Sequence, residues 1–176
     1  MENKPLPGIP GDPDNKVPAN HEYSFPLPYE RLQGEGLNSF ESLCFRVLMA
    51  EKKNPHFFAR KGQHDYGVDI RVIEDNGETT VYQCKNLKGG KDELNESDFK
   101  KAFDKFKKEW VEEQKLPVPQ RFIYCTSARV GTDKDSHAAF IKASDVFKEQ
   151  FLKGGGQPPK VVDFWDCDTL DEKLKN

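Results

Sequence analysis

The sequence of 176 residues contains no long hydrophobic run. Its apolar stretches are far shorter than the roughly 18 residues that a membrane-spanning helix needs. Its polar N-terminal end also lacks the apolar core of a secretory signal peptide. We therefore expect a cytoplasmic protein. A chain of this length is typical of one domain with a substantial core and is too short for two.

Cysteine is scarce, and it is not clustered along the sequence. The four cysteines are widely separated and each lies in an apolar segment: Cys44, Cys84, Cys125 and Cys167. Zinc sites and disulfide-rich domains are typically marked by closely spaced Cys or His residues, such as a CxxC pair. The sequence therefore predicts four buried free thiols, and it argues against a zinc site or a disulfide framework.

The sequence also lacks an excess of positive charge. Its 27 Lys and Arg residues stand against 30 Asp and Glu residues, which gives a net charge of −3. Proteins that hold nucleic acid through their overall charge are strongly basic. The composition therefore excludes that class, and any contact with nucleic acid has to come from a local basic cluster.

Residues 1–30 are rich in proline, with few apolar residues and no periodicity. We expect them to form an extended or disordered arm, in which Phe25–Tyr29 docks on the folded part of the chain. The folded domain is expected to span residues 31–176. It could stand alone or be the N-terminal domain of a larger protein.

Hydrophobic periodicity predicts the order helix, three strands, helix, strand, helix, strand, helix. The first helix should begin near residue 38 and end before Pro55, and the others should cover about 97–114, 136–153 and 168–174. Strands are expected near 56–60, 67–73, 79–85, 121–126 and 161–165. Asn76-Gly77 favours a hairpin turn between the second and third strands, whereas the later strands alternate with helices and should be parallel neighbours. The predicted fold class is α/β, with a mixed central β-sheet flanked by helices.

Polar residues inside the two hairpin strands are the main functional signal. Because side chains alternate across a strand, each strand separates its polar and apolar residues onto opposite faces. In the first strand, Asp69 projects from the face opposite to the one that carries three apolar residues: Val68, Ile70 and Val72. In the second strand, Gln83 and Lys85 project from the face opposite to the one that carries Tyr82 and Cys84. The hairpin therefore presents a carboxylate, an amide and an ammonium on one surface, as a metal and water site or as a salt bridge across an exposed sheet face.

The spacing from Asp69 to Gln83-x-Lys85 resembles the PD-(D/E)XK nuclease superfamily, in its Mrr-like branch, where this motif is Q-x-K. Three further features match that branch: the helix with Phe40-Glu41, the run Gly62–Asp69 and the apolar strand that ends at Thr126-Ser127. The resemblance covers roughly residues 38–174. It implies a restriction-endonuclease-like core and a nuclease-like domain over residues 31–176. The implied activity is that of a metal-dependent DNA endonuclease, the effector of a bacterial restriction or anti-phage defence protein.

The resemblance also implies catalytic roles. Asp69 would be the chief Mg²⁺ ligand, with the backbone carbonyl of Cys84 and the carboxylate of Glu41 completing an oxygen shell in which Mn²⁺ could substitute. Gln83 would offer a neutral amide oxygen in place of a carboxylate, which should weaken metal affinity or favour a single metal ion. Lys85 would hold the attacking water and help to deprotonate it.

Several further residues are candidates with a structural alternative. Glu41 could instead form a capping box with Asn38 at the start of the first helix. His64 and Asp65, in the loop before Asp69, are candidate auxiliary residues. Four residues are candidate DNA contacts: Lys88, Lys91, Ser127 and Arg129. The two lysines could equally belong to a solvated loop, and the lysine-rich face of helix 97–114 is expected to face solvent.

The expected partners are double-stranded DNA and, for activation, a second copy of the chain or a fused sensor or NTPase domain. Two alternatives share the same fold. One is a Holliday-junction resolvase, although such proteins are smaller and markedly basic. The other is a nucleic-acid or protein interaction module without turnover, an alternative that the neutral Gln83 keeps open.

Overall fold

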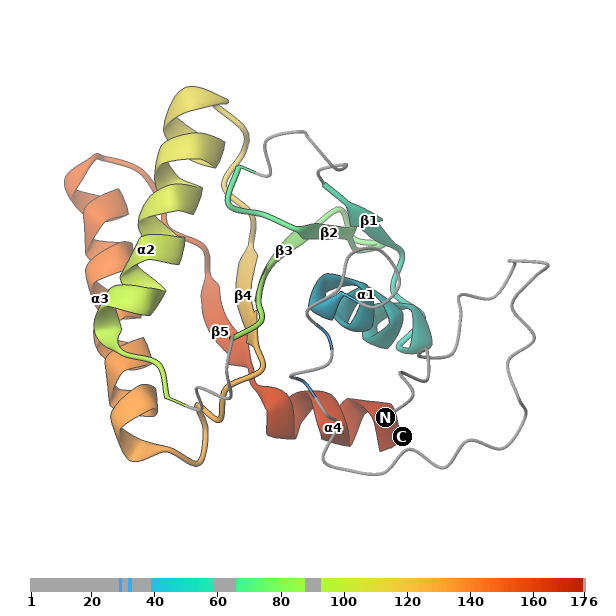
Figure 1. Cartoon of the computed structure of the whole chain (residues 1–176). Helices are drawn as coiled ribbons and strands as arrows, with labels where there is room; N and C mark the ends of the chain where they lie inside the picture. The colour runs from blue at the N-terminus through green and yellow to red at the C-terminus, as the bar shows by residue number, and fades with distance from the viewer. Residues whose placement is uncertain (1–28, 30–31, 33–38, 59–65, 88–92, 176) are drawn as a thin grey trace.

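The computed structural model describes residues 29, 32, 39–58, 66–87 and 93–175. They form an α/β fold in which a five-stranded mixed sheet is flanked by helices (Figure 1), as the sequence predicts. The elements are α1 (Phe40–Ala50), β1 (Pro55–Phe57), β2 (Ile70–Ile73), β3 (Thr79–Lys85), α2 (Glu96–Phe106), η4 (Lys107–Glu113), β4 (Arg121–Thr126), α3 (Lys134–Lys153), β5 (Val161–Trp165) and α4 (Cys167–Lys175). The predicted element order is therefore confirmed, apart from the π-helical segment η4 that continues α2.

The strand order within the sheet follows the sequence order, β1-β2-β3-β4-β5. β1, β2 and β3 are antiparallel neighbours, and β4 and β5 extend the sheet in parallel with β3. The antiparallel pair β2 and β3 is closed by a short turn in which Gly77 has a φ of +80°. The parallel pairs need crossover connections, which α2 with η4 and then α3 supply. The expected hairpin and the expected parallel pairs are both confirmed.

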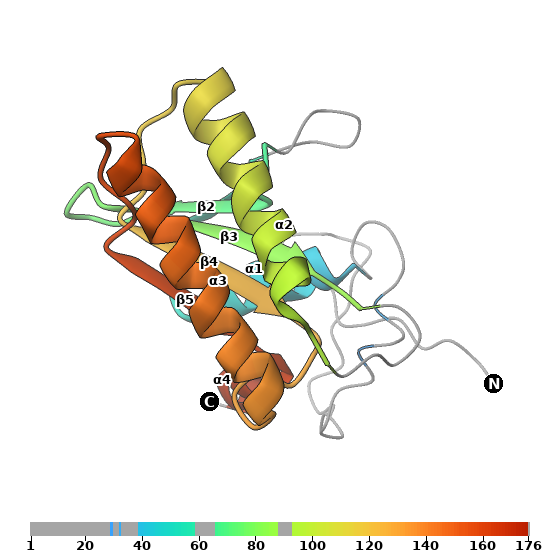
Figure 2. The same cartoon turned by 90° about the vertical axis from the view of Figure 1, so that its left-hand side faces the viewer.

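The helices form two layers, one on each face of the sheet. α2 and α3 lie side by side over one face, and α1 and α4 pack together over the other (Figures 1 and 2). No helix within the described ranges combines the length and the apolar character needed to cross a lipid bilayer.

Each face of the sheet buries its own core. The α1 and α4 side buries mainly aliphatic and cysteine side chains, including Val47, Ile70 and Ile123. The α2 and α3 side is dominated by phenylalanine. Phe103, for example, contacts the rings of Phe122 and Phe147 at centroid distances of 5.5 and 4.8 Å. Truncating such a buried ring to alanine costs about 3–5 kcal/mol.

Two local expectations are wrong. The N-cap of α1 is Ser39, whose side chain accepts a hydrogen bond from the Ser42 backbone N–H at 3.1 Å, so Glu41 is not at the position that a capping box requires. Val68 does not share a face with Ile70, because regular strand geometry begins only at Ile70. Val68 packs in the α2 and α3 core, and Ile70 packs in the opposite one.

Tyr29 docks on the folded domain. Its hydroxyl donates hydrogen bonds to the Asp171 carboxylate at 2.6 Å and to the Cys167 carbonyl at 3.0 Å, both in α4. Asn86, the residue after β3, donates from Nδ2 to the carbonyl oxygens of Tyr29 and Leu32. This part of the N-terminal region is therefore attached to the end of β3. Residues 1–28 of the expected arm lie outside the described residues.

Candidate active site

Asp69 is positioned by a glycine that fits closely against α2. Gly67 has a φ of +72°, and a Cβ atom at this position would lie 2.8 Å from the backbone N and Cα of Phe106. A side chain would therefore be excluded both by backbone conformation and by contact with the helix. The absence of a side chain lets the segment before β2 lie directly against the C-terminal end of α2.

The Asp69 carboxylate is held between β2 and β3. Its Oδ2 atom accepts hydrogen bonds from Gln83 Nε2 and from the backbone N–H of Cys84, each at 2.6 Å. The Asp69 backbone N–H donates to the Tyr82 carbonyl at 2.9 Å, and the Asp69 carbonyl accepts from the Phe58 N–H at 2.9 Å. The structure therefore brings together Asp69 and Gln83, which are fourteen residues apart in the sequence. The backbone of Asp69 is held by hydrogen bonds to Tyr82 on one side and to Phe58 on the other.

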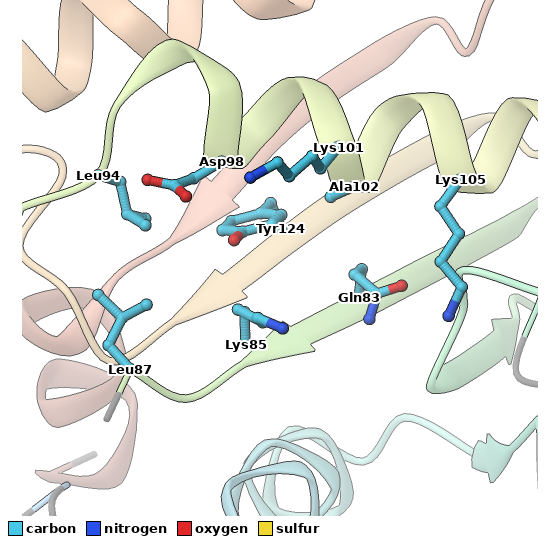
Figure 3. A pocket seen from close by; sticks show the side chains of 9 residues that line it. All are labelled: Gln83, Lys85, Leu87, Leu94, Asp98, Lys101, Ala102, Lys105 and Tyr124. Carbon is cyan, nitrogen blue, oxygen red and sulfur yellow. The ribbon is translucent and has the colours of Figure 1, made fainter. Parts of the chain in front are cut away.

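Gln83 and Lys85 project into a cleft between β3 and α2 (Figure 3). The cleft has a volume of about 300 Å³. Tyr124 joins its lining because it is the register partner of Gln83 in the neighbouring strand β4. The remaining lining residues come from α2 and from the segment that precedes it: Leu87, Leu94, Asp98, Lys101, Ala102 and Lys105. The two motif residues of β3 therefore face α2, as expected from their shared side of the strand.

The cleft is predominantly positive. Among the described residues, Lys85, Lys101 and Lys105 line it together with a single carboxylate, that of Asp98. Asp98 is already engaged in the capping box of α2, where its Oδ2 accepts from the Asn95 backbone N–H at 3.1 Å. Lys105 extends from α2 toward Gln83 (Figure 3). Three ammonium groups around one opening favour an anionic ligand, such as a phosphodiester.

Lys101 and Lys105 were missed at the sequence level, where the lysine face of this helix was expected to face solvent. Lys101 lies three residues after Asp98 and four residues before Lys105, so all three side chains lie on one stripe of α2. That spacing was a usable signal. The sequence does not show that α2 lies over β3. This position is what turns the stripe toward Gln83 and Lys85.

Tyr124 is another residue that sequence reasoning placed only in a buried strand. Its side chain is 1% exposed and its ring packs edge-on against Phe99 at 5.2 Å. Burial raises the pKa of its hydroxyl well above the ordinary value. The hydroxyl therefore stays neutral and can act as a hydrogen-bond donor beside Gln83.

Glu41 is not part of the cleft lining. It is exposed in the first turn of α1, and α1 packs on the Cys84 face of the sheet, opposite to the cleft. The structure therefore brings together Asp69, Gln83 and the backbone N–H of Cys84, and it places Lys85 in the cleft that Gln83 also lines. Glu41 is not among the described residues that line this cleft.

The candidate DNA contacts that can be placed have structural partners. Ser127 Oγ accepts a hydrogen bond from the Leu87 backbone N–H at 2.9 Å, which ties the segment after β3 to the end of β4. Arg129 Nε lies 3.8 Å from an Asp168 carboxylate oxygen at a half-exposed position. Four other candidates lie outside the described residues: His64, Asp65, Lys88 and Lys91.

The oxygen atoms around Asp69 are of the type that Mg²⁺ prefers. Gln83 Oε1 is buried and has no hydrogen-bond partner, although the Nε2 atom of the same amide is bonded to Asp69. A buried acceptor without a partner is unusual. Because Nε2 is the end that faces Asp69, Oε1 could join a cation held by Asp69 only if the two ends of the amide exchanged. Carboxylate and amide oxygens are hard ligands, so the Asp69 and Gln83 pair could hold a divalent cation.

All four cysteines are free and buried, as predicted. Three of them, although far apart in the sequence, lie together in the fold. The Sγ atoms of Cys44, Cys84 and Cys125 all lie within 4.8 Å of one another. Burial raises the pKa of Cys44 and of Cys125 well above the ordinary value. Sequence spacing could not reveal this cluster, because its members come from three separate elements.

Comparisons with models of protein families, with curated proteins and with solved structures found no match to this chain. The class that the structure itself defines is an α/β protein with a five-stranded mixed sheet and a cationic cleft beside a paired Asp and Gln. Any functional assignment therefore depends on the chemistry of that cleft.

Proposed function

We propose that this protein is a metal-dependent DNA endonuclease with a restriction-endonuclease-like core, the effector of a bacterial restriction or anti-phage defence protein. One observation carries the proposal. Asp69 and Gln83 are in direct contact at 2.6 Å, and Gln83 shares a cationic cleft with Lys85. A carboxylate, an amide and an ammonium at adjoining positions are the groups needed to bind a cation and to act on a phosphodiester.

The carboxylate of Asp69, the amide oxygen of Gln83 and the carbonyl of Cys84 would hold Mg²⁺, with Mn²⁺ able to substitute. Gln83 presents its Nε2 atom to Asp69, so binding through Oε1 requires the side-chain amide to rotate and exchange its two ends. When bound, the cation would neutralise phosphate charge and lower the pKa of a coordinated water. Glu41 remains a proposed contributor from α1.

The lysines of the cleft would act on the substrate phosphate. Lys85 is exposed at the end of β3 and would orient the attacking water and stabilise the charge that develops on the phosphate. Lys101 and Lys105 would face the phosphate from α2 and hold the strand against β3. Because the net charge of the chain is −3, these local contacts would have to supply most of the attraction to DNA.

One site of this kind cuts one strand of a duplex. Cleavage of both strands of double-stranded DNA would therefore require two copies of the domain, in a homo-oligomer or brought together by a fused sensor or NTPase domain. Weak binding by a single copy would keep cleavage low until copies assemble.

A second function, nucleic-acid binding without turnover, is favoured by one specific observation. Gln83 Nε2 and the Cys84 N–H both donate to Asp69 Oδ2, so this oxygen is satisfied without a cation. Because Gln83 is neutral where a second carboxylate would bind the metal, the protein would keep its fold and its cationic cleft and would bind nucleic acid without cleaving it.

Nicking of supercoiled plasmid by the purified chain distinguishes the two functions. An endonuclease should convert supercoiled to open-circular plasmid in Mg²⁺ or Mn²⁺ and should stop in EDTA. If the protein binds the plasmid and slows its migration in a gel, but the plasmid stays supercoiled at every Mg²⁺ and Mn²⁺ concentration, the binding module is supported and the endonuclease is contradicted.

A further inference from the structure

Three cysteines that are distant in sequence meet in the α1 and α4 core. Cys44 comes from α1, Cys84 from β3 and Cys125 from β4, with their Sγ atoms within 4.8 Å of one another. Cys84 and Cys125 are direct partners in the parallel register of the two strands, so their side chains leave the sheet next to each other. The side chain of Cys44 completes a triangle of sulfur atoms from the helix that covers this face.

The sulfur triangle is enclosed by apolar side chains. Cys44 and Cys125 have no exposed surface and Cys84 is 6% exposed. Among the described residues, no histidine or carboxylate joins the three sulfur atoms within the same distance. A ligand of this triangle would therefore have to bind three sulfur atoms without a fourth protein donor. It would also have to leave little net charge, since an unpaired charge in an apolar core is strongly unfavourable.

We propose that Cys44, Cys84 and Cys125 form a binding site for a trivalent thiophilic element, which the protein would take up as arsenous acid. Trivalent arsenic binds three sulfur atoms in a pyramid, and three thiolates cancel its formal charge of three. Zn²⁺ with three thiolates would leave a net negative charge, and structural zinc sites are almost always four-coordinate. The number of sulfur atoms and the apolar surroundings both favour the trivalent element.

The reaction balances without an external reagent: As(OH)₃ + 3 R–SH → As(S–R)₃ + 3 H₂O. Three As–O bonds break and three As–S bonds form, and each thiol proton leaves on an arsenic-bound hydroxyl group as water. Arsenic remains trivalent, so neither an oxidant nor a reductant is consumed. No charge enters or leaves the core, which distinguishes this ligand from Zn²⁺.

The adduct would connect α1, β3 and β4 through a single atom. Because the ligand binds only where the three sulfur atoms are held together, it should stabilise the folded state. The sulfur atoms are enclosed, so binding requires local opening of the core. The rate of adduct formation should therefore reach a plateau as the arsenite concentration rises, at the rate of that opening.

Intact-mass spectrometry and thermal unfolding with sodium arsenite, in a phosphine reductant, test the proposal. The wild-type chain should gain one arsenic atom and lose three hydrogen atoms, and its Tm should rise. Zn²⁺ at the same concentration should give a smaller rise in Tm. The substitution Cys125→Val keeps an apolar side chain of similar size and should abolish both the three-bond adduct and the rise in Tm.

Cys167→Ala is the matched control, because Cys167 is buried but lies outside the triangle. It should form the same adduct as the wild type. If Cys125→Val does not fold, Cys44→Ala provides the same test from the helix side. Absence of an arsenic adduct in the wild type, equal adducts in wild type and Cys125→Val, or a larger stabilisation by Zn²⁺ would each overturn the proposal.

Discussion

Gln83 donates a hydrogen bond of 2.6 Å to Asp69 Oδ2 and leaves its own buried Oε1 atom without a partner. The amide thus supports the carboxylate in the orientation seen here, and its unsatisfied oxygen would gain a partner if the two ends of the amide exchanged around a cation bound at Asp69. This relationship joins the two strands of the hairpin at the side of the cleft. It also determines how substitutions at either position should behave.

Asp69→Ala should reduce both stability and metal binding. It removes the acceptor of two hydrogen bonds and leaves the Cys84 N–H unsatisfied, so the free energy of unfolding should fall by about 1–3 kcal/mol. Urea denaturation and calorimetric titration with Mn²⁺ measure the two effects. Asp69→Asn is the matched control, since it keeps an oxygen acceptor and removes the charge. It should retain more stability than Asp69→Ala but should also lose metal binding, and full Mn²⁺ affinity in Asp69→Asn would show that the metal lies elsewhere.

Gln83→Glu should make the protein more dependent on a divalent cation. Two carboxylates would then replace the amide-to-carboxylate hydrogen bond, and their repulsion should lower the Tm in EDTA. Bound Mg²⁺ would be held by both charges, so the rise in Tm on adding Mg²⁺ should exceed that of the wild type. An identical response to Mg²⁺ in the two proteins, with the fold intact, would remove Gln83 from the proposed metal site.

Lys101→Ala and Lys105→Ala should each weaken DNA binding and lower its salt dependence. Each lysine that neutralises one phosphate contributes a slope of about 1 to the dependence of log K on log salt concentration. Lys100→Ala is the matched control, because Lys100 is exposed on α2 and does not line the cleft. Fluorescence anisotropy over a range of salt concentrations gives the slopes. Equal slopes for all three variants would mean that the cleft does not contact DNA.

Gly67→Ala should destabilise the protein more than Gly77→Ala. Both glycines have positive φ angles, and a left-handed backbone costs a residue with a side chain about 1–2 kcal/mol. Gly77 has open space where a Cβ would lie, whereas the Cβ at Gly67 would be 2.8 Å from the Phe106 backbone. Equal losses in urea denaturation would show that the contact with α2 can relax at little cost.

The sequence predicted the elements whose pattern is local. The bounds of β4 and β5 match the expected strands 121–126 and 161–165, because each is a short apolar run with a clear beginning and end. The hairpin was equally clear, since Asn76-Gly77 specifies a tight turn. The placement of Asp69 beside Gln83 followed from that turn, which sets the register of β2 against β3.

Features that depend on contacts between distant elements were not predictable. The face of Val68 depends on where β2 begins, and that depends on how Gly67 meets α2. The convergence of Cys44 with Cys84 and Cys125 requires the helix α1 to cover β3 and β4, which no sequence spacing encodes. Hydrophobic periodicity assigns a residue to a face but does not determine which element covers that face.

The rate of plasmid nicking by Lys85→Ala, compared with the wild type at equal occupancy by Mg²⁺, tests the central claim most directly. An ammonium group cannot ligate a cation, so the variant should bind Mg²⁺ at least as well as the wild type. Loss of the charge that orients water and stabilises the phosphate should lower the nicking rate by about 100-fold or more. Lys100→Ala should nick at the wild-type rate. Nicking by Lys85→Ala at the wild-type rate would contradict the assignment of this cleft as the active site.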